Sequence, residues 1–251
     1  MSAVSYTSSD NDDNGHGSHV AGIIAAVNNS IGVVGVAPAA DLYAVKVLDR
    51  NGSGYLSDII EGLQWVVKNQ QIKVVNMSLG TSSLSASFAS AVQVTIASGV
   101  VVVAAAGNSG PGDNTVMYPA KFAGVIAVSA TNSDPFNTIA SFSSRGPEVD
   151  LAAPGVSVFS TYKNQSYATL SGTSMASPHV AGVAALVLSS PIGGDDVSSP
   201  TGDLPNGKWD PNEVERRLER TAQDLGTSGL DTSYGNGLVR ADLAVVAPVA
   251  P

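Results

Sequence analysis

Hydrophobic residues along this chain alternate between two kinds of pattern. Continuous apolar runs suit strands that are buried on both faces of a parallel sheet. The segments between and after them carry apolar residues at helical spacing and predict amphipathic helices. The expected strands are Leu42–Val47, Val74–Ser78, Val100–Ala105 and Val125–Ala130, and the expected helices are Ser18–Val27, Leu56–Lys68, Ala86–Ala97, Met175–Leu188 and Glu213–Thr221.

This alternation predicts an α/β fold, a doubly wound and mostly parallel sheet with helices on both faces. Ser57 is placed to cap the helix at Leu56–Lys68, and Gly99 suits the C-terminal cap of the helix at Ala86–Ala97. Residues 190–212 interrupt the pattern with Gly, Pro, Ser and Asp, so we interpret them as a surface insertion. At 251 residues, we expect one domain with a substantial core.

The segment around Ser174 carries the strongest chemical signal in the sequence. Gly172 and Thr173 precede the serine, and Pro178 follows in what should be the first turn of a helix, where proline is tolerated. The pattern predicts a tight turn that presents Ser174 at a helix N-terminus, where backbone N–H groups favour developing negative charge. An acyl-transfer nucleophile requires such a place; the alternative is a Gly-Ser loop before an ordinary helix.

Two further segments supply groups that would complete such a site. His16 lies in a Gly-flanked loop just before a helix with an apolar stripe, and singly it is typical of a loop histidine. Asn108 follows the apolar run Val100–Ala105, at the strand end where ligands gather in parallel sheets. Its amide suits an oxyanion hole, although asparagine is also a common turn former. With Ser174, the three residues provide a nucleophile, a base and an oxyanion donor.

Seven longer segments follow one another in a fixed order along the chain. They are HGSHVAG at 16–22, NNSIGVVGVAP at 28–38, LYAVKVL at 42–48, VVNMSLG at 74–80, VVVVAAAGN at 100–108, ASFSSRGP at 140–147 and GTSMASPHVAG at 172–182. Together they resemble the subtilases, the family of the bacterial subtilisins. The resemblance implies a serine endopeptidase acting on polypeptides, with Ser174 as nucleophile, His16 as general base and Asn108 in the oxyanion hole.

The resemblance also points to a group that this sequence does not supply. The third member of the subtilase triad is an aspartate at the end of an early strand, well before the histidine. Only fifteen residues precede His16, and Asp10, Asp12 and Asp13 resemble the family's non-catalytic approach to that histidine. We therefore expect an N-terminally incomplete subtilase domain that lacks the aspartate-bearing strand, and whose activity is in doubt for that reason.

A peptide groove is implied by the resemblance as well. The substrate would add as a strand between two enzyme segments, and an apolar pocket beside them would accept the P1 side chain. Met117 would lie at the floor of this pocket, which favours apolar P1 residues. The matching positions are Gly52, Ser53, Gly54, Ser78, Leu79, Gly80, Ala105, Gly107 and Met117.

Calcium is implied by the resemblance alone, as a structural cation. Backbone carbonyls and a side-chain amide of one loop would hold it, since oxygen ligands suit a hard cation. A second and weaker cation site would use three carbonyls with a carboxylate nearby. The first site would take Val27, Asn29, Ile31 and Val33, and the second Ala120, Phe122, Val125 and Asp150.

Composition narrows the remaining possibilities. The net charge of −9 argues against nucleic acid as a partner, and the absence of cysteine excludes thiol catalysis and disulfides. No apolar run is long enough to span a membrane, and the first residues do not form a signal peptide. The resemblance implies an extracellular monomer whose precursor carries a propeptide.

Two other functions compete with the endopeptidase. A pseudoprotease would keep the peptide groove without efficient catalysis, and an inactive fragment is the extreme form of that reading. An unrelated acyl hydrolase with a nucleophile elbow is suggested by Gly172-x-Ser174-x-Ala176. In such hydrolases the histidine follows the serine in the chain, whereas His16 precedes Ser174.

Overall fold

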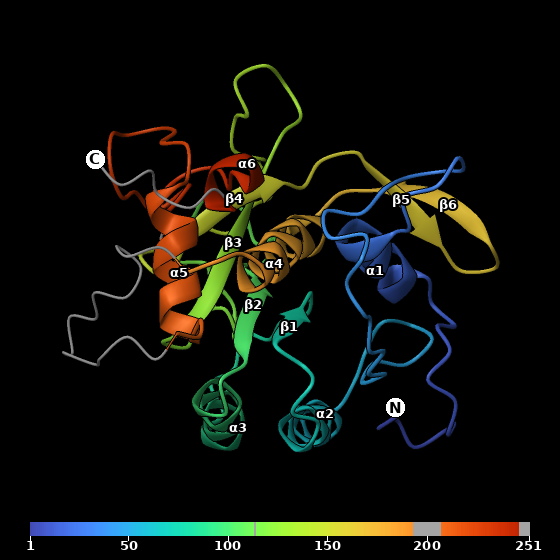
Figure 1. The fold of residues 1–251 in the computed structure, drawn as a ribbon. Helices are drawn as coiled ribbons and strands as arrows, with labels where there is room; N and C mark the ends of the chain where they lie inside the picture. Colours follow the sequence, from blue (N-terminus) through green and yellow to red (C-terminus); the bar gives the residue numbers. More distant parts are fainter. Residues whose placement is uncertain (113, 193–206, 246–251) are drawn as a thin grey trace.

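The structure is a computed structural model that describes residues 1–112, 114–192 and 207–245. A four-stranded parallel sheet with the order β1-β2-β3-β4 lies at its centre (Figure 1). A separate antiparallel hairpin is formed by β5 and β6. The strands are β1 (Val74–Met77), β2 (Val101–Ala105), β3 (Val125–Thr131), β4 (Leu151–Pro154), β5 (Val158–Tyr162) and β6 (Ser166–Leu170).

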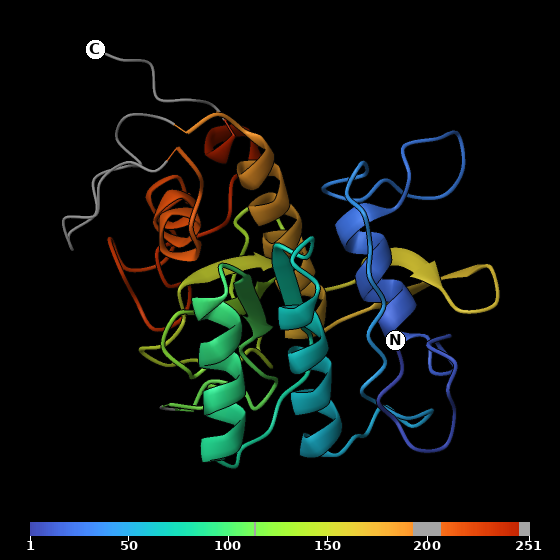
Figure 2. The same cartoon turned by 60° about the horizontal axis from the view of Figure 1, so that its bottom comes forward.

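Helices cover both faces of the sheet. Figure 2 shows α2 and α3 side by side in front of one face, with α4 and α5 on the opposite side. Helix α1 packs against α4 and against the β5–β6 hairpin, beside the sheet rather than on it. The helices are α1 (His16–Ala25), α2 (Leu56–Lys68), α3 (Ala86–Ala97), α4 (Thr173–Ser189), α5 (Pro211–Arg220) and α6 (Ala241–Ala244).

The strand pleat explains why the central strands are apolar throughout. Side chains alternate between faces, so Val101 and Val103 of β2 join a cluster with α4 and α5, while Val102 and Ala104 join one with α2 and α3. Every residue of β2 and β3 is buried. This arrangement confirms the predicted doubly wound α/β fold.

Helix α4 is buried on most of its surface because small residues allow close approach from several directions. Ala176, Ala181 and Ala184 of this helix lie in the core, and all three are at most 1% exposed. At Gly182, a Cβ atom would lie 2.7 Å from Cβ of Val36, so a larger residue would push the loop after α1 away. A helix that is apolar on all sides is expected in such a position.

The helix predictions agree with the structure at α2 and α3, and those for α1, α4 and α5 differ from it by one or two residues at each end. Gly99 follows α3 with φ of +87° and donates to the carbonyl of Ile96, as predicted for a C-terminal cap. The predicted Ser57 cap is wrong. Tyr55 occupies the N-cap position, and the Ser57 hydroxyl instead donates to the Asp58 carboxylate.

The predicted strand Leu42–Val47 does not form among the described residues. Backbone hydrogen bonds join Lys46 to Met1 and Ala3, which gives only an isolated bridge. β1 pairs with β2 along one edge and with no described strand along the other. A strand needs a neighbouring ladder for its backbone groups, and this apolar segment lacks one; Leu42 is accordingly 51% exposed.

Strands β4, β5 and β6 and the short helix α6 were not predicted from the hydrophobic pattern. Most of the expected insertion at 190–212 lies outside the described residues, since only 190–192 and 207–212 are described. In the part of the chain that the structure describes, no helix is both long and apolar enough to cross a bilayer.

The core between α3 and the sheet gives the first prediction. Phe88 is fully buried and meets Phe122 edge to face, with the ring centroids 5.5 Å apart. Phe88→Ala should lower the free energy of unfolding by about 3–5 kcal/mol in urea denaturation. The exposed Phe136 provides the control, because Phe136→Ala should change it by less than about 0.5 kcal/mol. Equal effects of the two substitutions would contradict the proposed core.

Candidate active site

Ser174 lies in the first turn of α4, one residue after the helix begins. Gly172 precedes the helix and anchors the turn, because its N–H donates to the Gly155 carbonyl at 2.8 Å. The Ser174 side chain is partly exposed, and its hydroxyl makes a long contact of 3.4 Å to the carbonyl oxygen of Ser78. The turn therefore presents the serine at the helix N-terminus, where the sequence predicted it.

Pro178 lies deeper in α4 than the first turn, which corrects the expected helix start. A proline there cannot donate to the carbonyl of Ser174, four residues earlier. The Ser78 hydroxyl donates to that carbonyl at 2.8 Å instead. Asn76 donates to Ser78 and accepts from Ser177 of α4, so a polar network ties the end of β1 to the helix turn that carries Ser174.

Asn108 follows β2 and is held against the same turn. Its Oδ1 accepts hydrogen bonds from the backbone N–H of Thr173 at 2.9 Å and from the Thr173 hydroxyl at 3.0 Å. The Thr173 hydroxyl in turn accepts from the N–H of Gly107. Because Oδ1 already accepts these hydrogen bonds, the Nδ2 amide group of the exposed Asn108 side chain is left to donate to a ligand beside Ser174.

A cavity of about 300 Å³ opens directly beside these two residues. Met117 forms part of its wall and packs over Gly107, where a Cβ atom would lie 2.8 Å from the methionine Cγ. The structure thus gathers five of the expected groove residues around Ser174 and Asn108. The cavity is lined by Leu79, Gly80, Ala105, Gly107, Asn108, Ser109, Met117, Thr173 and Ser174.

The other expected groove residues lie outside this cavity. Gly52, Ser53 and Gly54 are exposed in a loop that the Asp49 carboxylate organises by accepting from the N–H groups of Asn51 and Ser53. Ser78 is nearly buried and acts in the network under Ser174.

His16 begins α1, and a left-handed glycine sets its position. Gly15 has φ of +110°, and a Cβ atom there would lie 2.2 Å from the ring of Tyr162. Burial lowers the pKa of the His16 imidazole, and His19 adds to this effect, while the Asp12 charge opposes it. Helix α1 packs against α4 through Val20 and Ile23, which contact Met175, the residue after Ser174.

The ring of His16 forms no hydrogen bond with another described residue. Asp12 accepts from backbone N–H groups, Asp10 pairs with the N-terminal amine, and Asp13 pairs with Lys46 and Tyr6. None of these three carboxylates orients the imidazole. The structure therefore brings the expected nucleophile and the expected oxyanion donor together at one cavity, and leaves the expected base without an acidic partner among the described residues.

The remaining histidines have structural roles. His19 is fully buried, and its Nε2 lies 3.1 Å from the carbonyl oxygens of both Val158 and Ala168 in the hairpin. The Nδ1 atom of His179 lies 2.8 Å from the Met175 carbonyl oxygen, within α4.

The expected calcium loop follows α1. Val27, Ile31 and Asn29 are exposed, and Asn29 Oδ1 accepts from the N–H of Ile31, which tightens the loop. No described donor bonds to the carbonyls of Val27, Ile31 or Val33, so these oxygens suit a hard cation. In the expected weaker site, the Phe122 carbonyl accepts from the N–H of Val125, and Ala120 lies in the buried turn just before them.

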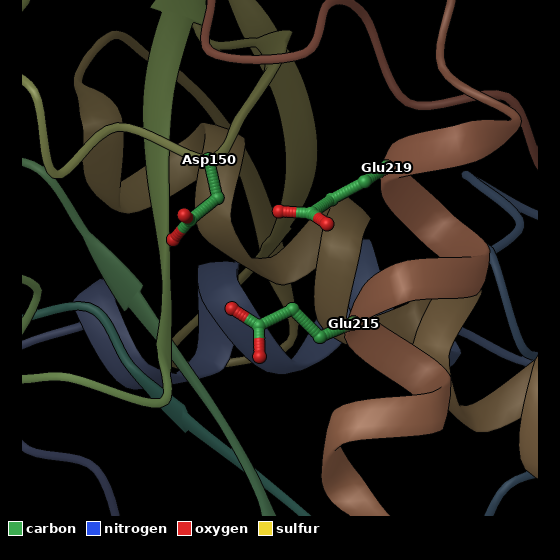
Figure 3. Close-up of side chains that lie close together, drawn as sticks. All are labelled: Asp150, Glu215 and Glu219. Atoms are coloured by element: carbon green, nitrogen blue, oxygen red, sulfur yellow. The ribbon is translucent and has the colours of Figure 1, made fainter. Parts of the chain in front are cut away.

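Asp150 belongs to a carboxylate cluster that the sequence did not indicate. Glu215 and Glu219 lie one turn apart on α5 and point toward Asp150, which precedes β4 (Figure 3). The carboxylate oxygens of the three residues lie within 4.8 Å of one another. Asp150 also accepts from the N–H of Ala127 at 2.7 Å, so the cluster joins β3 to α5.

Comparison with known proteins decides the family. The model of the subtilase family matches residues 2–237. The chain belongs to the subtilase family. Over 243 residues it is 49% identical to a thermostable alkaline protease of Halalkalibacterium halodurans, covering 97% of this chain and 61% of that protein. It is also 49% identical to Subtilisin Savinase of Lederbergia lenta, over 93% of this chain and 78% of the relative.

A solved structure shows the same fold. Sphericase superposes with a TM-score of 0.83 at 34% sequence identity, covering 95% of this chain and 83% of that one. The subtilase chain described here spans only part of several relatives, including 55% of the M-protease of Shouchella clausii, to which it is 50% identical.

The carboxylate cluster predicts how the stability of this subtilase depends on pH. Burial, with the charge of Glu219, raises the pKa of Glu215 to about 7 from 4.5. Burial also raises the pKa of Asp150 to about 8, and nearby glutamates add to this. A folded-state pKa above the unfolded value stabilises the fold at low pH, and this contribution is lost as pH rises through the folded pKa.

The free energy of unfolding should therefore fall between about pH 4 and pH 8 through this cluster. Glu215→Gln keeps the side-chain shape and removes one charge, so it should make the fall shallower in denaturant titrations at a series of pH values. Glu61→Gln, an exposed glutamate on α2, is the matched control. A pH dependence that Glu215→Gln leaves unchanged would show that the cluster does not bind protons as described.

Proposed function

We propose that this chain is a serine endopeptidase that cleaves peptide bonds through an acyl-enzyme on Ser174. The observation that carries the proposal is the pair of hydrogen bonds from Thr173 to Asn108 Oδ1. They hold the side-chain amide of Asn108 at the cavity beside the serine. Oxyanion stabilisation by a preorganised donor is usually the largest single term in acyl transfer. Named proteases among its relatives support the same reaction class.

The reaction follows from the roles of three side chains. Ser174 Oγ attacks the carbonyl carbon of the peptide bond while His16 takes the hydroxyl proton. The negative oxygen that forms accepts from Asn108 Nδ2 and lies at the N-terminus of α4. His16 then gives its proton to the leaving amine, and water hydrolyses the ester with His16 again as base. The lowered pKa of His16 leaves the imidazole neutral and ready to accept a proton near neutral pH.

The substrate is proposed to bind as an extended strand between two segments. Gly52, Ser53 and Gly54 are exposed on one side, and Leu79 and Gly80 line the cavity on the other. Glycines let a second backbone approach closely, and the backbone groups of Leu79 and Gly80, which bond to no described residue, would hydrogen-bond to the peptide.

A peptide-binding protein without efficient turnover is the second candidate. One observation favours it: no described carboxylate orients the ring of His16, and such a group normally fixes the imidazole tautomer and stabilises the imidazolium. In subtilisin, loss of the triad aspartate alone lowers kcat by a factor of about 3 × 10⁴. Turnover by this chain therefore depends on a carboxylate supplied to that ring.

Calcium is proposed as a structural ion of the loop after α1. The support is the set of free carbonyl oxygens at Val27, Ile31 and Val33 with the side chain of Asn29. Titrating calcium into chelator-treated protein should raise the temperature of unfolding, and an unchanged temperature would argue against the site.

Secretion as a monomer, from a precursor with a propeptide, is also proposed. One relative, 46% identical, is named a minor extracellular protease of Bacillus subtilis. Fractionating cultures that express the full reading frame would test this, since the mature protein should be found in the medium at monomer size.

Covalent labelling tests the nucleophile apart from turnover. A fluorophosphonate probe should phosphonylate Ser174, because the oxyanion donor and the helix N-terminus are in place. Peptide mapping should locate the adduct at Ser174, and Ser174→Ala should abolish it while Ser171→Ala, an exposed neighbour, should not. Labelling without peptide turnover would favour the peptide-binding candidate, and labelling that survives Ser174→Ala would remove the assignment.

The lining of the cavity predicts which P1 residues are preferred. Met117 and Ala105 make the walls apolar, and no acidic side chain lines the cavity, so cleavage should follow apolar P1 residues. In a peptide library, Met117→Gly should extend the preference toward bulkier aromatic P1 residues by deepening the cavity. Dominant cleavage after arginine or aspartate would contradict the apolar pocket.

A further inference from the structure

Asp12 holds the turn that delivers His16. Its Oδ1 accepts hydrogen bonds from the N–H groups of Asn14 at 3.0 Å and Gly15 at 2.8 Å. Its Oδ2 accepts from the N–H of Ser18 at 2.7 Å. A single carboxylate therefore spans the last residues of the loop and the first turn of α1, with His16 between its partners.

The bond from Ser18 replaces the cap that Gly15 cannot give, and the Asn14 side chain accepts from the N–H of His16 beside it. The N-cap residue of α1 is Gly15, which has no side chain to accept the N–H of the third helical residue. That residue is Ser18, whose N–H bonds to Asp12 instead. Gly15 must be glycine because of its φ of +110° and the adjacent Tyr162 ring, so the cap has to come from elsewhere in the chain.

The same carboxylate acts on the charge of the imidazole. Although burial opposes it, hydrogen bonding from Gly15, Ser18 and Asn14 holds the pKa of Asp12 below its usual value, so the group is ionised at neutral pH. Its charge opposes the burial and the neighbouring His19, which both lower the pKa of His16. Asp12 thus favours the protonated ring.

We propose that Asp12 is a positioning residue for His16, which fixes the turn that carries the ring and stabilises the imidazolium by its charge without touching the ring. The proposal rests on the proposed function only in taking His16 as the base. Asp12 acts through the helix backbone and through space, so its role differs from that of a carboxylate bonded to the ring. The hydrogen bonds of Asp12 fix the geometry of the turn. An experiment can separate this effect from that of the Asp12 charge on the imidazole of His16.

Direct titration of His16 provides that experiment, because the chain has only three histidines. The pKa of each imidazole is measured by NMR in the wild type, with His16→Ala used to assign the His16 signal. In Asp12→Asn the pKa of His16 should fall, since the charge is lost while one acceptor oxygen remains for the turn. His19 serves as an internal reference, because Asp12 is not among the groups that shift its pKa.

Asp13→Asn is the matched control. It removes the same charge from the adjacent residue, whose carboxylate pairs with Lys46 and Tyr6 rather than with α1. The pKa of His16 should not change in this variant. If Asp12→Asn does not fold, Asp12→Ser supplies a short uncharged acceptor for the cap and takes its place.

The rate of fluorophosphonate labelling against pH gives a second readout. Its acidic limb should move to lower pH in Asp12→Asn, because a weaker base stays neutral to lower pH. A lower unfolding temperature with an unchanged His16 pKa would reduce Asp12 to a structural cap and overturn the proposal, as would equal shifts in the Asp12 and Asp13 variants. Failure of the proposed function would be seen separately, as absence of labelling in the wild type.

Discussion

The close packing of α4 against the sheet is the constraint on which the site depends. Its alanines lie on β2, β3 and β4, and Gly182 admits the loop after α1 to within van der Waals contact. Protein interiors are packed as densely as organic crystals, so a helix held on several sides cannot shift by even a fraction of its diameter without opening voids. Ser174 takes its position from this rigid helix.

Polar contacts around the N-terminus of α4 fix the side chains that surround Ser174. Thr173 fixes the amide of Asn108. The Ser78 hydroxyl donates to the Ser174 carbonyl, which Pro178 cannot do because it has no backbone N–H. Each buried polar group that such contacts satisfy avoids a penalty of about 1–3 kcal/mol. Ser174 and Asn108, the proposed nucleophile and oxyanion donor, are therefore held in place, whereas His16 depends on α1 and on a loop beside the sheet.

Sequence patterns predicted what local periodicity determines. The apolar stripes of α2 and α3 and the buried runs of β2 and β3 gave the right elements, since a long amphipathic or apolar segment has few other ways to be buried. The motifs also indicated Ser174, His16 and Asn108, which the structure places on α4, α1 and the end of β2. The strand predicted at Leu42–Val47 was wrong. Its pattern suits a strand, but no described strand lies beside it to pair with its backbone.

Features that depend on distant partners could not be predicted. Glu215 and Glu219 share a helix face by their spacing, yet nothing in the sequence pairs them with Asp150, sixty-odd residues earlier. The hairpin β5–β6 was missed because only Ser160 of its ten strand residues is buried, and because its turn uses Asn164 and Gln165 at positive φ, without a glycine. The cap that Asp12 gives to α1 likewise depends on a turn at Gly15 that only the folded chain shows.

The proposed mechanism requires that Asn108 is held ready for the oxyanion before substrate arrives. A crystal structure of the fluorophosphonate adduct tests it most directly, because the phosphoryl oxygen occupies the place of the oxyanion. This oxygen should lie about 2.7–3.1 Å from Asn108 Nδ2, with Oδ1 still bonded to the N–H of Thr173. A phosphoryl oxygen turned away from Asn108, or an Asn108 side chain that has left Thr173 to reach it, would show that Asn108 is not a preorganised oxyanion donor.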